Sequence, residues 1–350
     1  MTAQRPARTT NRPSTARITY FDWLRGAATI AVVVLHVFNK MLTDHSLDEL
    51  GMPLVLTWTE LQLVFTRWAV PLFLMITGAL LLDPKRDVSW EKIGRYVARM
   101  AAVLLVFCPV YTCMSARAIT LDAIIDGLGR ALTKGSWDHL WYIYALIGLY
   151  LLTPILQLYV RHASQAMQRT TLLVLAVPTL VIPTINAAAG AGIATFAWVT
   201  SSLLYYLLGT YAHQYLQLDK RLAGIGLAAL AVGMAAIVAF VVWQHTYPKW
   251  LIVPECPLVA LWALLLFVAA KRCLQGRPAP AILAYASRHS LGIYLFHPLI
   301  LIIFYRRLWW MPYEQLPPVI FELVVIGATL AGAVALVEVA DRIPGLRRIL

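Results

Sequence analysis

The sequence is poor in charge and lacks the short motifs of common soluble enzymes. Asp, Glu, Lys and Arg make up 13% of its 350 residues, against roughly 25% in a soluble globular domain. It contains no glycine-rich phosphate loop, no HExxH zinc pattern and no GxSxG nucleophile elbow. These absences argue against a soluble domain and against the P-loop, zinc-protease and serine-hydrolase classes that use those motifs.

Cysteines and membrane-embedded acids are also scarce. The four cysteines, Cys108, Cys113, Cys256 and Cys273, lack the spacing of metal ligands. Most of them fall in or beside hydrophobic runs, so we expect no disulfide framework and no metal site. Few acidic residues lie deep in the hydrophobic runs, and the serial Asp, Glu and His residues of a proton-driven pump are missing.

The sequence does contain many long hydrophobic runs. Hydrophobic residues make up 60% of the chain, and ten runs approach the roughly 20 residues that a helix needs to cross a bilayer. The runs lie at about 23–42, 64–82, 96–114, 139–159, 170–186, 196–214, 222–243, 254–272, 289–306 and 318–339. A weakly amphipathic segment, about 120–133, is predicted to lie at the membrane interface. The fold class is therefore predicted to be all-α: a polytopic membrane helix bundle of about ten transmembrane helices.

Basic residues predict the orientation of this bundle. The net charge is +12, and the Lys and Arg residues lie mainly between the hydrophobic runs. This placement is typical of topology signals and of contact with anionic membrane lipids rather than with nucleic acid. With the N-terminus in the cytoplasm, 21 of the 29 Lys and Arg residues fall on the cytoplasmic side, so both termini are predicted to be cytoplasmic. Arg306 and Arg307 break this pattern: either they contact substrate, or the ninth span is shorter than drawn.

The predicted domain organisation is simple. Residues 1–17 are basic and rich in Pro, Thr and Arg, and we expect them to form a disordered cytoplasmic tail. Residues 18–340 are expected to form a single transmembrane domain, followed by a short cytoplasmic tail at 341–350. No small-residue cleavage site follows the first hydrophobic run, so we interpret that run as a retained span.

One stretch, Tyr20 to His36, combines charge with membrane depth. Arg25 and His36 are eleven residues apart, so they share a helix face with about 16 Å of rise between them, and Asp22 falls on nearly the same face. A buried neutral imidazole is a good general base or acyl acceptor, and arginine binds phosphate through paired hydrogen bonds. This face suits a long donor with a phosphate at Arg25 and its reacting group at His36. Asp22 would either orient Arg25 or cap the start of the helix. The alternative is structural: Arg25 sets topology and His36 bonds a neighbouring helix.

Two more arginines stand at the inner end of the third span. Arg95 and Arg99 are one helical turn apart and therefore project from similar positions on the helix. They either extend a phosphate site or mark the cytoplasmic side of the membrane. Both readings place them on the cytoplasmic side of the membrane.

Aromatic and histidine side chains supply the candidate substrate contacts. His139, Trp141 and Tyr142 lie at the outer edge of the fourth span, where aromatic residues usually form an interfacial belt. His297 lies about halfway along the ninth span, directly before a proline, and either lines the same cavity as His36 or is structural. The full set of candidate substrate contacts is Asp22, Trp68, His139, Trp141, Tyr142 and His297.

Five segments resemble acyltransferase family 3, the integral-membrane acyltransferases that O-acetylate bacterial surface and secreted polysaccharides. The family's arginine, ten intervening residues and histidine correspond to Arg25 and His36 within FDWLRGAATIAVVVLH. The second segment, RWAVPLFLMITGALLL, is similar to the family's second span, with Thr77 in place of the usual serine. The others are KIGRYVARMAAVLLVFCPVY with Arg95 and Arg99, HLWYIYALIGLYLLTPIL, and SRHSLGIYLFHPLIL. They follow the family's order over about 18–340.

The resemblance implies a function and a site. It implies ten core helices, a cytoplasmic acyl-CoA donor, usually acetyl-CoA, and an essential histidine, here His36. We therefore expect a bacterial inner-membrane O-acetyltransferase that acts on a surface polysaccharide, an exopolysaccharide or a lipid-linked sugar. Acetyl-CoA would bind among Arg25, Arg95 and Arg99, and His36 would act either as a base or as an acyl carrier. The chain resembles the short stand-alone form, without the SGNH domain of some relatives, and other polysaccharide-assembly proteins are possible partners.

Other functions fit the same residues. A transporter or flippase for a polar or lipid-linked sugar would use the buried side chains as ligands, without acyl chemistry. A membrane scaffold for polysaccharide assembly would make the deep histidines incidental. Within the enzyme class, the alternatives are transfer of a longer acyl group and acylation of a peptide or antibiotic.

Overall fold

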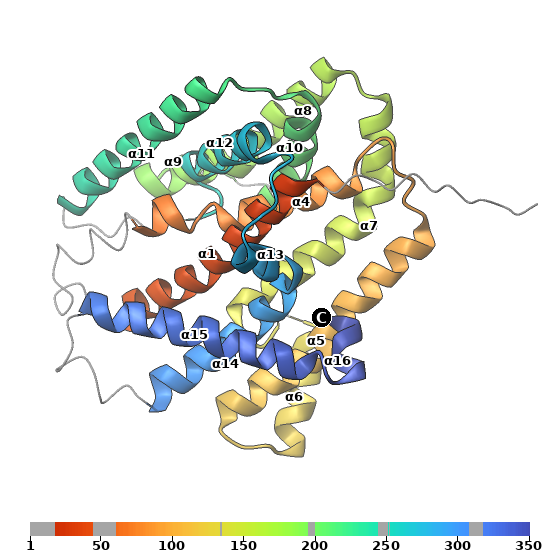
Figure 1. Cartoon of the computed structure of the whole chain (residues 1–350), viewed down its shortest axis with the longest axis vertical. Coiled ribbons are helices and arrows are strands. Elements are labelled where there is room, and N and C mark those ends of the chain that lie inside the picture. The colour runs from red at the N-terminus through yellow and green to blue at the C-terminus, as the bar shows by residue number, and fades with distance from the viewer. Residues whose placement is uncertain are drawn as a thin grey trace, which may run out of the picture.

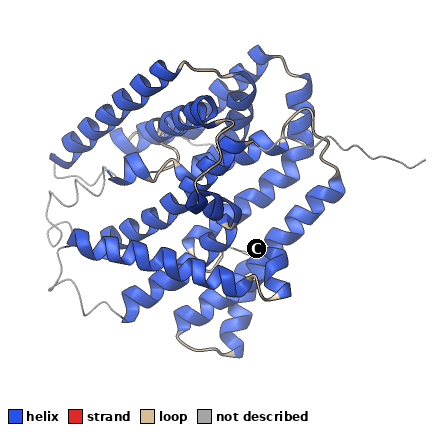
Figure 2. Cartoon of the chain, in the orientation of Figure 1, coloured by secondary structure: helices blue, strands red, loops and turns tan. Residues whose placement is uncertain are grey.

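The chain folds into helices throughout the part that the structure describes. The computed structural model describes residues 18–44, 61–133, 135–194, 200–243, 251, 253–307 and 318–350. Within these ranges every regular element is a helix (Figure 2). The all-α prediction is confirmed, while the predicted tail at 1–17 lies outside the described residues.

The described residues form the following helices, in chain order. They are α1 (Thr19–Asp44), α4 (Ala69–Leu81), α5 (Trp90–Ala116), α6 (Leu121–Ala131), η1 (Asp138–Leu140), α7 (Trp141–His162), α8 (Gln165–Ala176), η2 (Val177–Val181), α9 (Ile182–Ala189), α10 (Ser201–Tyr215), α11 (Lys220–Trp243), α12 (Pro257–Leu274), α13 (Ala281–Arg288), α14 (Ser290–Arg307), α15 (Pro318–Ala340) and α16 (Pro344–Ile349). In Figure 1, α11 and α6 lie at opposite ends of the molecule.

The described residues include eight helical segments that are long and apolar enough to cross a membrane. A bent pair, Ala281–Arg288 with Ser290–Phe304, makes nine if it forms one span. The remaining predicted span, 196–214, corresponds to α10, whose 15 residues extend about 22 Å, short of a hydrocarbon core of roughly 30 Å. The protein is thus a polytopic helix bundle, and its orientation stays a prediction. The side chains of Arg306 and Arg307 lie outside the described residues.

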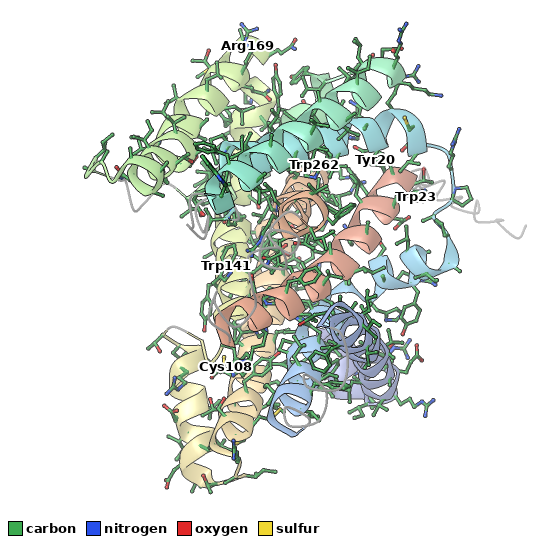
Figure 3. The ribbon with its side chains drawn as sticks, turned by 90° about the vertical axis from the view of Figure 1, so that its left-hand side faces the viewer. Tyr20, Trp23, Cys108, Trp141, Arg169 and Trp262 are labelled. Carbon is green, nitrogen blue, oxygen red and sulfur yellow. The ribbon has the colours of Figure 1, made fainter. Side chains whose placement is uncertain are left out.

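Helix α1 runs through the middle of the bundle (Figure 1) and contacts α4, α12, α13, α14 and α15. In the side view, Tyr20 lies at one end of α1, whereas Arg169 of α8 projects from the outer edge (Figure 3). Tyr20 is 1% exposed, and its ring meets that of Phe267 in α12 edge-on at 5.6 Å. Because α1 is surrounded by protein, its polar side chains must find partners or a cavity inside the bundle.

Glycines allow α4 and α10 to cross at very short distance. A Cβ atom on Gly78 would lie 1.8 Å from the carbonyl oxygen of Tyr206, and one on Gly209 would lie 2.0 Å from that of Met75. Small residues permit such close backbone approach between membrane helices. The crossing buries α10 and holds α4 in place beside α1.

The predicted interfacial segment forms α6, which folds back along α5. Thr120 caps the helix by accepting a hydrogen bond from the Ala123 amide at 3.2 Å. A Cβ on Gly127 would lie 2.4 Å from Cα of Pro109 in α5, so the two helices touch through their backbones. Cys108, beside Pro109, is buried, and all four cysteines are free thiols, as expected from the sequence.

A bend of 87° separates α13 from α14 at His289. Helix α13 lies directly on α1, because a Cβ on Gly26 would be only 2.2 Å from the carbonyl oxygen of Leu283. The two helices are also joined by a hydrogen bond of 3.1 Å from Ser287 Oγ to Asp22 Oδ1. The bend was not predicted from the sequence. It places the start of α14 beside the charged end of α1.

Candidate active site

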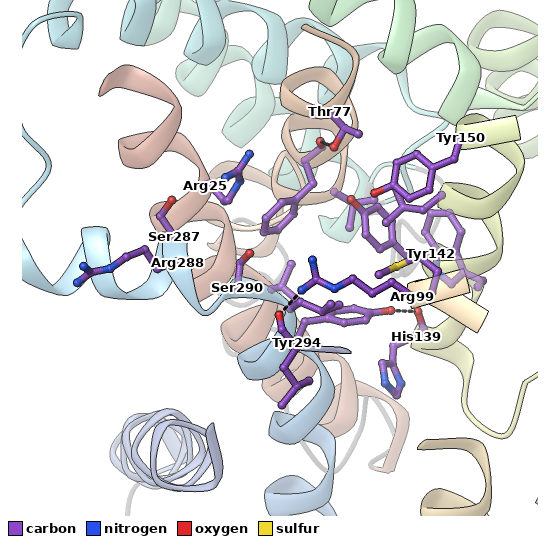
Figure 4. A pocket seen from close by; sticks show the side chains of 18 of the residues that line it. Arg25, Thr77, Arg99, His139, Tyr142, Tyr150, Ser287, Arg288, Ser290 and Tyr294 are labelled. Atoms are coloured by element: carbon purple, nitrogen blue, oxygen red, sulfur yellow. Dashed lines mark hydrogen bonds between the residues drawn. The ribbon is translucent and has the colours of Figure 1, made fainter. Parts of the chain in front are cut away.

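A cavity of about 350 Å³ lies beside α1 within the bundle. Its walls come from α1, α4, α5, α7 and the bent pair α13–α14 (Figure 4). Six of the residues singled out from the sequence line it: Arg25, His36, Arg99, His139, Trp141 and Tyr142. The shared helix face predicted for Arg25 and His36 is therefore a shared cavity wall.

Arg25 marks the end of the cavity at the start of α1. Its neighbour Gly26 brings α13 against α1 at this point, so Ser287 and Ser290, on either side of the bend, line the cavity close to the guanidinium (Figure 4). Asp22 does not line the cavity; it accepts the Ser287 hydrogen bond instead. Asp22 thus helps to hold the α1–α13 contact that frames Arg25.

The two arginines of α5 differ in position although they are one turn apart. Arg99 lines the cavity (Figure 4), and its Nε donates a hydrogen bond of 3.0 Å to the carbonyl of Ile349. Its Nη2 donates to the carbonyl of Leu350. Arg95 has a 71% exposed side chain, 4.0 Å from Glu91, and lies outside the cavity. Only one of the pair therefore faces the same space as Arg25.

Three histidines from distant parts of the chain meet at the deep end of the cavity. The ring of His36 lies 5.0 Å from that of His297 and 6.1 Å from that of His139, measured between centroids. His139 and His297 are 6.0 Å apart. His36 and His139 line the cavity, whereas His297 is completely buried behind them. In the described part of the chain, no three His, Cys, Asp or Glu side chains converge to hold a metal ion.

Hydrogen bonds to tyrosine hold the histidine cluster in place. His139 Nε2 lies 3.1 Å from the hydroxyl of Tyr111 in α5. That hydroxyl donates its proton to the carbonyl of Leu295 in α14. Tyr294, one residue earlier, donates to the carbonyl of His139 (Figure 4). Helices α5, η1 and α14 are therefore joined by hydrogen bonds around the imidazoles.

Aromatic side chains form another wall of the cavity. Trp141 is 44% exposed and meets Tyr142 edge-on at 6.1 Å. Phe73 of α4 faces Tyr142 across 6.3 Å. Trp68 lies outside this wall, since its indole N–H donates to the carbonyl of Val64 at 2.9 Å and it does not line the cavity.

One cavity inside a membrane bundle thus carries arginines at one end and histidines at the other. The acyltransferase 3 domain model matches residues 18–338. The chain belongs to acyltransferase family 3. No curated protein and no solved structure matches it. The protein is accordingly a multi-pass membrane acyltransferase, which requires an acyl donor and an acyl acceptor.

The cavity of this acyltransferase has the parts that acyl transfer needs. An imidazole can take a proton from an attacking hydroxyl or attack the acyl carbonyl itself. A guanidinium can bind the anionic part of a donor with paired hydrogen bonds. His36 and Arg25 supply these groups on one helix, about 16 Å apart along its axis.

Several lining residues were missed by sequence reasoning. Thr77, Tyr150, Ser287, Ser290 and Tyr294 all face the cavity (Figure 4). Tyr294 stands three residues before His297, so helical spacing from the second deep histidine pointed to it. Thr77 occupies the position at which the chain differs from the family's usual serine. The two serines lie in the segment SRHSLGIYLFHPLIL that resembles the family, but the sequence did not show that the bend at His289 brings them to the cavity.

Proposed function

We propose that this acyltransferase is a bacterial inner-membrane O-acetyltransferase. It would move the acetyl group of cytoplasmic acetyl-CoA to a hydroxyl of a surface polysaccharide, an exopolysaccharide or a lipid-linked sugar. The observation that carries the proposal is that Arg25, Arg99, His36 and His139 line one cavity. Its two functional ends are about 16 Å apart along α1, which suits a donor with phosphates at one end of a long arm and a thioester at the other.

The donor would enter at the arginine end. Arg25 and Arg99 would bind its phosphates, helped by the hydroxyls of Ser287 and Ser290. Arg99 has five N–H donors, of which two now bond backbone carbonyls of the C-terminal segment, so the others are available to a phosphate. The geometry favours these two arginines over Arg95, which would at most contact the outermost part of the nucleotide.

His36 would carry the chemistry at the other end. As a general base it takes the proton of the acceptor hydroxyl while the oxygen attacks the thioester carbonyl. The C–S bond then breaks, and the proton passes to the leaving thiolate to give free CoA and the acetyl ester. In the alternative route, an imidazole nitrogen of His36 attacks the thioester carbonyl, and the C–S bond breaks to release CoA as a thiolate. The acceptor oxygen then attacks the acetyl carbonyl, the C–N bond breaks, and the hydroxyl proton passes through the freed imidazole to the thiolate, giving free CoA and the acetyl ester. Both routes require a ring nitrogen with a free lone pair facing the cavity.

The acceptor would approach along the aromatic wall. Trp141 and Tyr142 offer flat apolar surfaces with polar edges beside His139, and Trp141 remains 44% exposed. A sugar ring placed there would present a hydroxyl to the histidine end of the cavity. The chemistry of the wall does not select a particular sugar.

The decisive experiment replaces His36. We expect His36→Ala to lower acetyl transfer from acetyl-CoA by about 10²–10⁴-fold, the usual contribution of a general base. Transfer is measured in membranes with labelled acetyl-CoA and in cells as O-acetyl content of surface glycans. The control is His162→Ala, at the exposed end of α7, which should act like the unmodified protein. Normal transfer by His36→Ala would refute the site. Purified protein that neither binds nor hydrolyses acetyl-CoA would refute the function and favour a transporter.

A further inference from the structure

His297 presents an unusual buried nitrogen to the histidine cluster. Its side chain is 0% exposed, and its Nε2 has no hydrogen-bond partner among the described residues. Its ring is 5.0 Å from that of His36, with an angle of 37° between the planes. Leaving a buried polar atom without a hydrogen-bond partner costs free energy. A partner for this nitrogen is therefore to be sought among its neighbours.

The hydrogen bonding of His297 shows which of its nitrogens carries the proton. Nδ1 lies 3.2 Å from the carbonyl oxygen of Ile293, one turn earlier in α14. A carbonyl oxygen can only accept, so Nδ1 must be the donor. In a neutral imidazole the other nitrogen is then bare. Nε2 of His297 is therefore an acceptor that lacks a donor.

Among the aromatic neighbours of His297, elimination leaves one donor. The rings in contact with His297 are those of His36, His139 and Tyr294. The hydroxyl proton of Tyr294 is donated to the carbonyl of His139.

The single proton of a neutral His139 is also committed. Tyr111 donates its own proton to the carbonyl of Leu295, so its oxygen can only accept from His139 Nε2, 3.1 Å away. Neither His139 nor Tyr294 has a further proton to give. His36 is the remaining ring neighbour that does.

We propose that His297 is a positioning residue whose Nε2 accepts the N–H of His36. The separation of 5.0 Å allows this through rotation about the soft χ2 angle of histidine or through one bridging water. The bond selects one tautomer of His36, so the other nitrogen keeps its lone pair and faces the cavity. The catalytic consequence rests on the proposed function, since a base or an acyl carrier needs that lone pair.

The pairing also explains why a neutral residue suits this position. When His36 takes up a proton, its N–H toward His297 becomes a charge-assisted donor, and such hydrogen bonds are roughly twice as strong as neutral ones. His297 would thus favour the charged state of His36 that forms during the reaction. It would not itself contact either substrate, because it does not line the cavity.

Two variants of His297 test the proposal. His297→Leu removes the acceptor, and we expect kcat to fall about 10- to 100-fold, as for other orienting partners, with KM for acetyl-CoA unchanged. His297→Gln retains an acceptor oxygen and should recover a large part of kcat. Equal losses in the two variants would overturn the proposal, as would full activity of His297→Leu.

A readout independent of activity is the tautomer of His36. In ¹⁵N-histidine-labelled protein in lipid bilayers, we expect one protonated and one bare nitrogen on His36, with a coupling across the bond to His297 Nε2 when the bond is direct. His297→Leu should mix the two tautomers. His213→Leu is the matched control. His213 Nδ1 lies 2.7 Å from the hydroxyl of Tyr20, and His213 does not line the cavity. This substitution should leave the spectrum of His36 unchanged. A single, unaltered tautomer in His297→Leu refutes the pairing.

The same experiments separate this proposal from the proposed function. If the unmodified protein transfers no acetyl group, the function is wrong, while the ¹⁵N spectrum still decides whether His36 and His297 are paired. If transfer occurs and needs His36 but neither kcat nor the tautomer responds to His297→Leu, only the pairing is wrong. Should His297→Leu fail to fold, the spectrum of the unmodified protein alone remains decisive: two interconverting His36 tautomers refute the proposal.

Discussion

The contact between Gly26 and α13 offers a sharp test of how the fold positions the site. In Gly26→Ala, the new Cβ would lie 2.2 Å from the carbonyl oxygen of Leu283. Real Cβ atoms essentially never approach within 3.0 Å of such an atom, so α1 and α13 must separate by about 0.8 Å, the difference between those values. The neighbouring atoms of Leu283 belong to the backbone, so no side-chain rotation relieves the contact. Overpacking of this kind costs about 1–3 kcal/mol of stability.

The same shift has a predicted functional effect. It moves Ser287 away from Asp22 and Arg25, which frame the donor end of the cavity. A misplacement of about 1 Å can lower an enzymatic rate by as much as about 10²-fold, so we expect kcat/KM for acetyl-CoA to fall by about 10- to 100-fold.

Thermal unfolding in detergent and initial rates in membranes measure the two effects of Gly26→Ala. The control is Gly94→Ala in α5, where a Cβ would meet nothing within 4 Å. There the substitution should stabilise the helix by about 0.5–1 kcal/mol, because alanine is the better helix former. Wild-type stability and kcat/KM in Gly26→Ala would show that α1 and α13 are not in the close contact described.

Two further predictions concern the arginines and the end of α10. Arg99→Gln should raise KM for acetyl-CoA by about 10-fold or more, because a hydrogen bond to a charged group contributes about 1.5–3 kcal/mol. Arg95→Gln should raise KM less. Equal increases in KM would refute the distinction between the two arginines. Lys271 donates to the carbonyls of Ala212, His213 and Leu216 at 3.1, 2.6 and 2.8 Å. Lys271→Met should therefore cost about 1–3 kcal/mol of stability, seen as a lower unfolding temperature, whereas Arg272→Gln, at an exposed neighbouring position, should not.

Local periodicity accounts for what could be predicted from the sequence. Hydrophobic run length predicted the membrane helices, and the described residues contain eight candidate spans, or nine with the bent pair α13–α14. The 3.6-residue period placed Arg25 and His36 on one face, and both line the cavity. The family resemblance marked the same pair, and the domain match over 18–338 confirms the family.

Contacts between segments that are far apart in the sequence could not be predicted from these local patterns. Arg95 and Arg99 look equivalent in the sequence, but only Arg99 lines the cavity and meets the C-terminal segment. The serines at 287 and 290 reach the cavity because the helix bends by 87° at His289, a feature that no run of hydrophobic residues encodes. His36 and His297 were both recognised as deep histidines, yet their sequence positions said nothing about their separation.

The sequence by itself therefore determined that this is a helical membrane protein of the acyltransferase 3 family, and which face of α1 carries its ionisable groups. These properties depend on hydrophobicity, helical period and motif, all of which are local. Only the tertiary structure decided which arginine, tyrosines and serines join that face, and that three histidines from α1, η1 and α14 meet behind it. Their meeting depends on helix crossings set by close backbone packing, as at Gly26, and packing is a property of the whole chain.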